Sequence, residues 1–305
     1  MGMDFYKQVS DNKRMTVLMF LGFFVLIGLL SFVISVLLGG LSVYGLTYFT
    51  VFGFLTIVFA FVSYYSCDSI VTFVSGAKEA DKSAYKQLYN VVEEMVIASG
   101  LPMPKVFIIN DSAINAFATG RDPQHAVVCV TTGCLQFLSR DELQGVIAHE
   151  LSHIKNYDIR TMTIATVLVG IAVLLSDLIL RFTWYSRGNS DSRDNRLFFV
   201  LLVFGVVLAA LTPLIANLIK LAVSRSREFM ADAGSAEMTR NPLGLASALE
   251  KISNDKEPLE AANKATSHLY ISDPLKNTKG LWFKGLFQTH PDINERIALL
   301  KGMKY

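Results

Sequence analysis

Cysteine and charged residues are both scarce in this chain of 305 residues. The three cysteines, Cys67, Cys129 and Cys134, form neither a C-x-x-C pair nor an even set, so a disulfide framework is not expected. Reduced, buried thiols suit a reducing compartment on at least one side of a membrane. Charged residues make up 18% of the chain, the formal net charge is +2, and no Lys/Arg-rich block is present. A nucleic-acid partner is therefore not expected.

Long apolar runs take the place of charge. The mean hydropathy is +0.41, which is typical of an integral membrane protein. Two runs, about Val17 to Leu38 and Val43 to Tyr65, are long enough to cross a hydrocarbon core roughly 30 Å thick as helices. The uncharged linker between them predicts a tight hairpin. The first run is too long for a cleaved signal peptide, and a second run follows it at once.

A weaker hydrophobic segment, about Thr161 to Leu180, and a strong one, about Leu197 to Ile219, follow. The first contains Asp177, and the loop between them carries four arginines, so whether this pair fully spans a membrane stays open. If the pair crosses twice or not at all, the chain on both sides of it faces one compartment. We expect a hairpin at 1–66, a polar domain in two parts at 67–160 and 221–305, and the second hydrophobic pair at 161–220.

Basic residues predict the orientation, because they collect on the cytoplasmic side of membrane helices. They stand before the first apolar run and after the second, and the short linker has none. The residues concerned are Lys7, Lys13, Arg14, Lys78, Lys82 and Lys86. We therefore expect a multi-pass protein of the cell membrane, in contact with the lipid bilayer, whose polar domain is cytoplasmic.

The polar parts predict an α+β domain that is mainly helical with a small sheet. Strands are expected at Lys105 to Ile109 and Ala126 to Val130, where β-branched residues cluster. Ser139 and Glu142 form a capping box that opens a helix running to about Tyr157. Further helices are expected at 77–99, at 222–250 with a break near residues 241–242, and at 292–301.

The sequence H-E-L-S-H in that helix is the main chemical signal. His149 and His153 are four residues apart, so both imidazoles can face one metal ion. Glu150 lies beside them, where its carboxylate can take a proton from an attacking water. Two surface histidines on an ordinary helix would be the alternative explanation.

A catalytic metal site needs a third protein ligand and an open fourth position. Just past the fourth hydrophobic segment, Glu228 and Asp232 lie four residues apart and share a helical face. Glu228 would complete a two-His, one-Glu site, which favours one Zn²⁺ per chain. Asp232 could accept a hydrogen bond from the far nitrogen of a liganding imidazole, and we expect this to be His149. Glu237 and Asp158 are competing ligands.

Four motifs together resemble the HtpX family of heat-shock membrane zinc metalloproteases, in the gluzincin group with the CAAX-prenyl protease Ste24. The motifs are A-H-E-L-S-H-I-K-N-Y-D at 148–158, S-R-S-R-E-F-M-A-D at 224–232, N-A-F-A-T-G at 115–120 and T-H-P-D-I-N-E-R-I at 289–297. The resemblance covers nearly the whole chain. It implies a bacterial inner-membrane enzyme that cleaves misfolded or damaged membrane proteins as quality control.

Site residues can be carried over from this resemblance. It implies zinc ligands at His149, His153 and Glu228, a general base at Glu150, and a substrate-binding segment that comprises Asn115, Ala116 and Phe117. Because such proteases bind peptide as an added strand, an exposed sheet edge beside the metal is expected.

His290 and Arg296 match a further element of the family. Either could steady the oxyanion that forms on the substrate carbonyl. Equally, Pro291 could stand in the first turn of a helix while Arg296 forms an ion pair.

Three other functions compete with this hypothesis. An intramembrane protease would place H-E-x-x-H inside an apolar span, whereas this helix is too polar for lipid. CAAX-tail processing is a narrower variant of the main hypothesis, and four hydrophobic segments are few for a Ste24-like chamber. A non-catalytic zinc-binding scaffold would not require a carboxylate at Glu150. Substrate sequence, regulatory partners and oligomeric state are not predicted.

Overall fold

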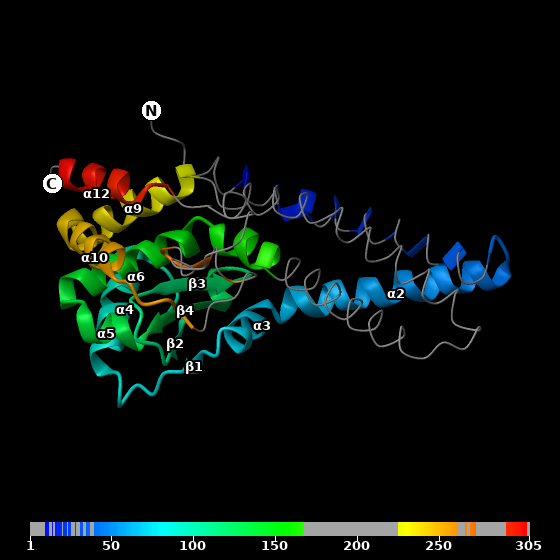
Figure 1. Ribbon diagram of the computed structural model, residues 1–305, viewed down its shortest axis with the longest axis horizontal. Coiled ribbons are helices and arrows are strands. Elements are labelled where there is room, and N and C mark those ends of the chain that lie inside the picture. Colours follow the sequence, from blue (N-terminus) through cyan, green and yellow to red (C-terminus); the bar gives the residue numbers. More distant parts are fainter. Residues whose placement is uncertain are drawn as a thin grey trace.

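A computed structural model describes residues 40–166, 225–260, 266, 269–272 and 291–303, together with scattered positions between residues 10 and 36. The described residues form a group of helices around a small sheet, from which one long helix projects (Figure 1). The prediction of a mainly helical domain with a small sheet is confirmed.

The projecting helix is α2, Val43–Tyr65. Its mean hydropathy is 2.0, so this helix of 23 residues is long and apolar enough to cross a membrane. Only 6% of its most apolar stretch of 18 residues is buried against the rest of the protein. Within the described ranges it is the one helix that meets this test. The segment at 17–38 is described only at scattered positions, and 167–180 and 197–219 lie outside the described residues. Four membrane helices are therefore not confirmed.

The sheet has four strands in the order β1-β2-β4-β3. The strands are β1 (Lys78–Glu79), β2 (Lys105–Ile109), β3 (Ala116–Gly120) and β4 (Ala126–Thr131). β2 and β4 run parallel, and both outer pairs are antiparallel. The predicted strands at 105–109 and 126–130 are confirmed.

The helix expected at 77–99 is wrong over its first nine residues. β1 lies there, because this stretch extends the sheet and the Ala80 N–H donates to Val106 O at 2.9 Å. Helix α4, Lys86–Ser99, follows and ends at Gly100, whose φ of 70° is the left-handed cap that glycine adopts without strain.

The remaining helices are α3 (Cys67–Val74), η1 (Pro123–His125), α5 (Thr132–Phe137), α6 (Arg140–Lys155), α9 (Arg225–Thr239), α10 (Pro242–Asn254) and α12 (Ile293–Gly302). The capping box of α6 is present: the Glu142 N–H donates to Ser139 Oγ at 3.4 Å, and the Ser139 N–H donates to the Glu142 carboxylate at 2.7 Å. Apolar side chains before and after residues 167–224 share one core. The domain boundaries at 66, 160 and 220 stay predictions.

Two glycines let the helices approach α6 closely. A Cβ on Gly234 of α9 would lie 1.9 Å from Ser152 Oγ, and one on Gly145 of α6 would lie 2.7 Å from the backbone nitrogen of Leu245 in α10. The Ser235 hydroxyl also donates to Gly145 O at 2.7 Å. This close packing fixes α9 against α6 and brings the first turn of α9 to the two histidines.

Candidate metal centre

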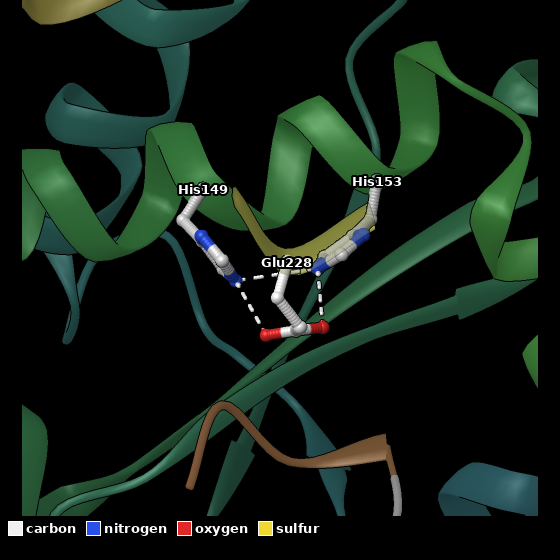
Figure 2. Close-up of side chains that lie close together, drawn as sticks. All are labelled: His149, His153 and Glu228. Carbon is white, nitrogen blue, oxygen red and sulfur yellow. Dashed lines mark hydrogen bonds and ion pairs between the residues drawn. The ribbon is translucent and has the colours of Figure 1, made fainter. Parts of the chain in front are cut away.

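His149 and His153 lie on the inner face of α6 and are 0% and 4% exposed. Their Nε2 atoms point toward each other at 3.2 Å, and Glu228 from the first turn of α9 faces both (Figure 2). The Glu228 carboxylate oxygens lie 3.8 Å from His149 Nε2 and 3.5 Å from His153 Nε2. One potential ligand atom from each of the three residues lies within 4.8 Å of the others. The structure thus brings together the three ligands that the sequence predicts.

The hydrogen bonds around these rings show that the three groups fit a metal ion. His149 Nδ1 lies 3.0 Å from Asp232 Oδ1, and His153 Nδ1 lies 3.1 Å from Asp158 Oδ2. An ionised carboxylate only accepts, so each Nδ1 carries the ring hydrogen and each neutral ring presents a lone pair at Nε2. Two lone pairs and a carboxylate facing one another in a buried space repel unless a cation lies between them. Two imidazoles and one carboxylate are a ligand set of catalytic zinc.

The pKa values of the two rings are shifted in opposite directions. Burial lowers the pKa of His149 and favours the neutral ring that a metal requires. Burial also disfavours charge on His153, but the hydrogen bond to Asp158 and the charge of Glu228 outweigh it and raise the pKa to about 9. The acidic groups around His153 thus favour positive charge on or beside this ring.

Glu150 follows His149 in α6 and is 2% exposed. Burial raises the pKa of Glu150 to about 7. The charge of His153 and a hydrogen bond from the Ala118 N–H oppose this rise, while the charge of Glu228 adds to it. A carboxyl group with a pKa near neutrality can both accept and release a proton at physiological pH.

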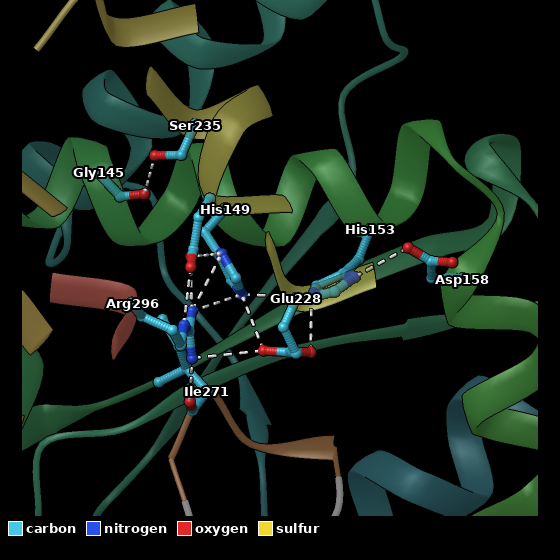
Figure 3. Close-up of polar contacts among 9 residues, drawn as sticks. Gly145, His149, His153, Asp158, Glu228, Ser235, Ile271 and Arg296 are labelled. Carbon is cyan, nitrogen blue, oxygen red and sulfur yellow. Dashed lines mark hydrogen bonds and ion pairs between the residues drawn. The ribbon is translucent and has the colours of Figure 1, made fainter. Parts of the chain in front are cut away.

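Arg296 of α12 is 1% exposed and is held by acidic partners (Figure 3). Its Nε and Nη2 donate to the two oxygens of Asp232 at 2.8 and 2.7 Å, and its Nη1 lies 3.3 Å from Glu228 Oε2. Burial disfavours its charge, but Asp232 and Glu228 raise its pKa, so the guanidinium stays charged. Of the two possibilities left open for Arg296, the structure contains the ion pair.

The start of α12 differs from the expectation. Asp292 is the N-cap and its side chain accepts from the Asn294 N–H at 2.7 Å, so Pro291 precedes the cap and does not stand in the first turn. His290 lies outside the described residues.

Asp158 is the site residue whose role sequence reasoning missed. It is not one of the clustered ligands: it is fully buried, binds His153 Nδ1 and lies 3.5 Å from Arg227 Nε. Tyr157 just before it has a φ of 59°, a left-handed conformation that is costly for a non-glycine residue and turns the chain at the end of α6. An acid just beyond the helix end was the available signal. Glu237, the other competing ligand, is exposed.

Replacing Asp158 by asparagine should weaken zinc affinity by about 10–100-fold, because the His153 ring loses the carboxylate that orients it and raises its basicity. Competition with a chromogenic chelator measures this change. Asp141→Asn, an exposed position at the start of the same helix, should leave the affinity unchanged. Equal affinities for the two variants would contradict this role of Asp158.

The predicted substrate segment, Asn115 to Phe117, lies just before and at the start of β3. β3 is an edge strand, but all five of its residues are buried, so the expectation of an exposed edge is wrong. The Asn115 side chain donates to Ser272 O at 3.1 Å, and Ala116 O accepts from the Ile271 N–H at 3.0 Å. The Phe117 ring packs edge-on against the ring of Tyr270. Substrate binding by Asn115, Ala116 and Phe117 stays a prediction.

Comparison with known proteins shows extensive similarity. The profile described as Peptidase family M48 matches residues 82–304. A protein named Protease HtpX homolog from Dictyoglomus thermophilum is 44% identical over 306 residues, which cover 98% of this chain and 95% of that protein. Proteins with the same name from Caldanaerobacter subterraneus and Streptococcus pneumoniae are 41% and 43% identical. Each alignment covers 98% of this chain, and the two alignments cover 97% and 99% of the related proteins, respectively.

A solved structure has a similar fold at low identity. The crystal structure of S. mikatae Ste24p aligns with a TM-score of 0.50 and 18% identity. The alignment covers 96% of this chain and 66% of that chain.

Proposed function

The chain belongs to peptidase family M48, and from this premise we propose that it is an integral-membrane zinc endopeptidase. It would cleave misfolded or damaged membrane proteins at the cytoplasmic face of the membrane. Membership of the family and the similarity to HtpX proteases make it a metalloprotease. The metal, the substrates and the membrane face are the parts that we propose.

One observation carries the proposal: the Nε2 atoms of two imidazoles and the Glu228 carboxylate converge in a buried space, and the buried Glu150 carboxylate lies within electrostatic reach of His153 and Glu228. A purely structural zinc site is usually closed by a fourth Cys or His. In the part of the chain that the structure describes, the cluster consists of two histidines and one glutamate, with no fourth protein ligand. Three protein ligands plus a nearby carboxylate are the pattern of a hydrolytic site.

Each residue of the site would have a distinct role in peptide-bond hydrolysis. When bound, zinc supplies polarisation of the scissile carbonyl and a more acidic attacking water. Glu150 accepts the proton of that water on its carboxylate and later delivers it to the leaving amine. Asp158 and Asp232 keep both histidine rings in the tautomer that presents Nε2. Arg296 fixes the position of the Asp232 carboxylate through two hydrogen bonds.

The membrane part of the proposal is supported by α2, whose apolar surface is exposed along its length. The basic residues that follow α2 favour a cytoplasmic catalytic domain. Quality control as the biological role comes from the resemblance to the HtpX family.

Removal and return of zinc tests the proposal. Full-length protein, purified in detergent and stripped by a chelator, should not cleave casein. Cleavage should return on addition of zinc and level off near one equivalent per chain. The proposal fails if protein that binds stoichiometric zinc cleaves no unfolded protein, a result that would favour the scaffold.

A further inference from the structure

The outer edge of β3 carries two backbone groups that lie beside the metal centre. Ala116 O accepts from the Ile271 N–H at 3.0 Å, and the Ala118 N–H donates to Glu150. Both groups point away from β4, with which β3 pairs on its other side. A peptide that adds to this edge as a strand would therefore bind next to the proposed general base.

The chain's own residues 269–272 already lie on this edge. Besides the bond from Ile271 to Ala116, the Asn115 amide donates to Ser272 O at 3.1 Å. Both bonds join the segment to Asn115 and Ala116, at the start of β3. The segment is thus attached to the sheet through main-chain groups, as an added strand would be.

The same segment reaches the metal centre through Arg296. Ile271 O accepts from Arg296 Nη1 at 3.2 Å, and that nitrogen is also 3.3 Å from Glu228 Oε2 (Figure 3). Both main-chain polar groups of Ile271 are therefore bound: its N–H donates to β3, and its carbonyl accepts from the arginine of the metal centre. An extended substrate aligned for cleavage would need this space.

The side chains of the segment are large and apolar. Leu269, Tyr270 and Ile271 are 3%, 0% and 2% exposed. The Tyr270 ring packs edge-on against Phe117 of β3, with ring centroids 4.9 Å apart. The space around the edge of β3 is thus shaped for apolar residues, and removing the segment would expose apolar surface to water.

We propose that residues 269–272 are a built-in occupant of the substrate edge. They would keep the protease closed until an extended chain with comparably large apolar side chains displaces them. Polar segments do not refill the apolar space and are rejected, so the substrates are the exposed apolar segments of unfolded proteins. This inference rests on the proposed endopeptidase function and adds its regulation and its substrate class.

The test uses zinc-loaded, full-length Glu150→Gln protein in detergent, which binds peptide without cleaving it. One synthetic peptide carries Leu-Tyr-Ile-Ser between polar flanks, and a matched peptide has serine in place of the three apolar residues. We expect the apolar peptide to bind at least about tenfold more tightly. At saturation it should speed hydrogen exchange at the Ile271 amide by about tenfold or more, while the Val128 amide in β4 stays unchanged.

Three results would overturn the inference. They are equal binding of the two peptides, binding of the apolar peptide with the Ile271 amide still protected, and no binding of it by a protein whose parent cleaves casein. The proposed function is tested apart from this, because it fails only if the zinc-loaded parent cleaves no casein.

Discussion

Glu150→Gln should lower kcat for casein cleavage by about 10²–10⁴-fold and leave the zinc content unchanged. Glutamine has nearly the same shape as glutamate and can still accept a hydrogen bond from the Ala118 N–H, but it cannot take a proton from water. Glu150 does not belong to the three-residue cluster, so metal binding should survive. Burial already disfavours the charged form of Glu150, and a neutral amide there should not unfold the domain.

Glu237→Gln is the matched control for this prediction, because the same change is made on α9 at an exposed position. It should cleave casein at the parent's rate. Steady-state kinetics at equal zinc loading, checked by elemental analysis, measures the difference. A Glu150→Gln protein that retains zinc and cleaves within a few-fold of the parent would remove Glu150 from the mechanism.

Arg296→Leu should destabilise the folded protein by about 3–5 kcal/mol, the range for breaking a buried ion pair by removing one partner. Arg296 donates two hydrogen bonds to Asp232 and one to Ile271 O, and all of these groups are buried. Leucine would fill part of the space but leave the Asp232 carboxylate without its cation. The expected result is a large drop in the thermal unfolding midpoint. Circular dichroism of the protein in detergent measures this midpoint.

Lys301→Met on the same helix serves as the comparison. The Lys301–Glu250 ion pair is 52% and 43% exposed at its two side chains, and exposed pairs contribute about 0–1 kcal/mol. The two substitutions should therefore differ by several kcal/mol. A midpoint for Arg296→Leu that matches that of Lys301→Met would show that the buried network is not what holds α12 to the site.

The parts of the site that lie within one helix could be predicted from sequence. The capping box at Ser139 fixes where α6 begins, and the i, i+4 spacing of His149 and His153 fixes which face they share. Both are local properties of a helix. Glu228 could be proposed from its spacing to Asp232, but only the packing of α9 on α6 brings it to the histidines.

The parts that depend on tertiary contacts could not be predicted. β1 is two residues long and forms only because it pairs with β2. Nothing local distinguishes this short stretch from the helix that follows it, so the sequence before α4 predicts a helix. The role of Asp158 depends on a left-handed residue at Tyr157, which carries none of the usual glycine signal. The attachment of residues 269–272 to β3 joins segments more than 150 positions apart in the chain.

X-ray absorption at the zinc edge of the zinc-loaded protein tests the central claim most directly. If His149, His153 and Glu228 hold the metal, the first shell should contain only nitrogen and oxygen, at about 2.0–2.2 Å. Sulfur should be absent, because Cys129 and Cys134 are buried and burial raises the pKa of Cys134 to about 12, which keeps its thiol protonated. A sulfur shell at about 2.3 Å, or no ordered shell at stoichiometric zinc, would contradict the assignment.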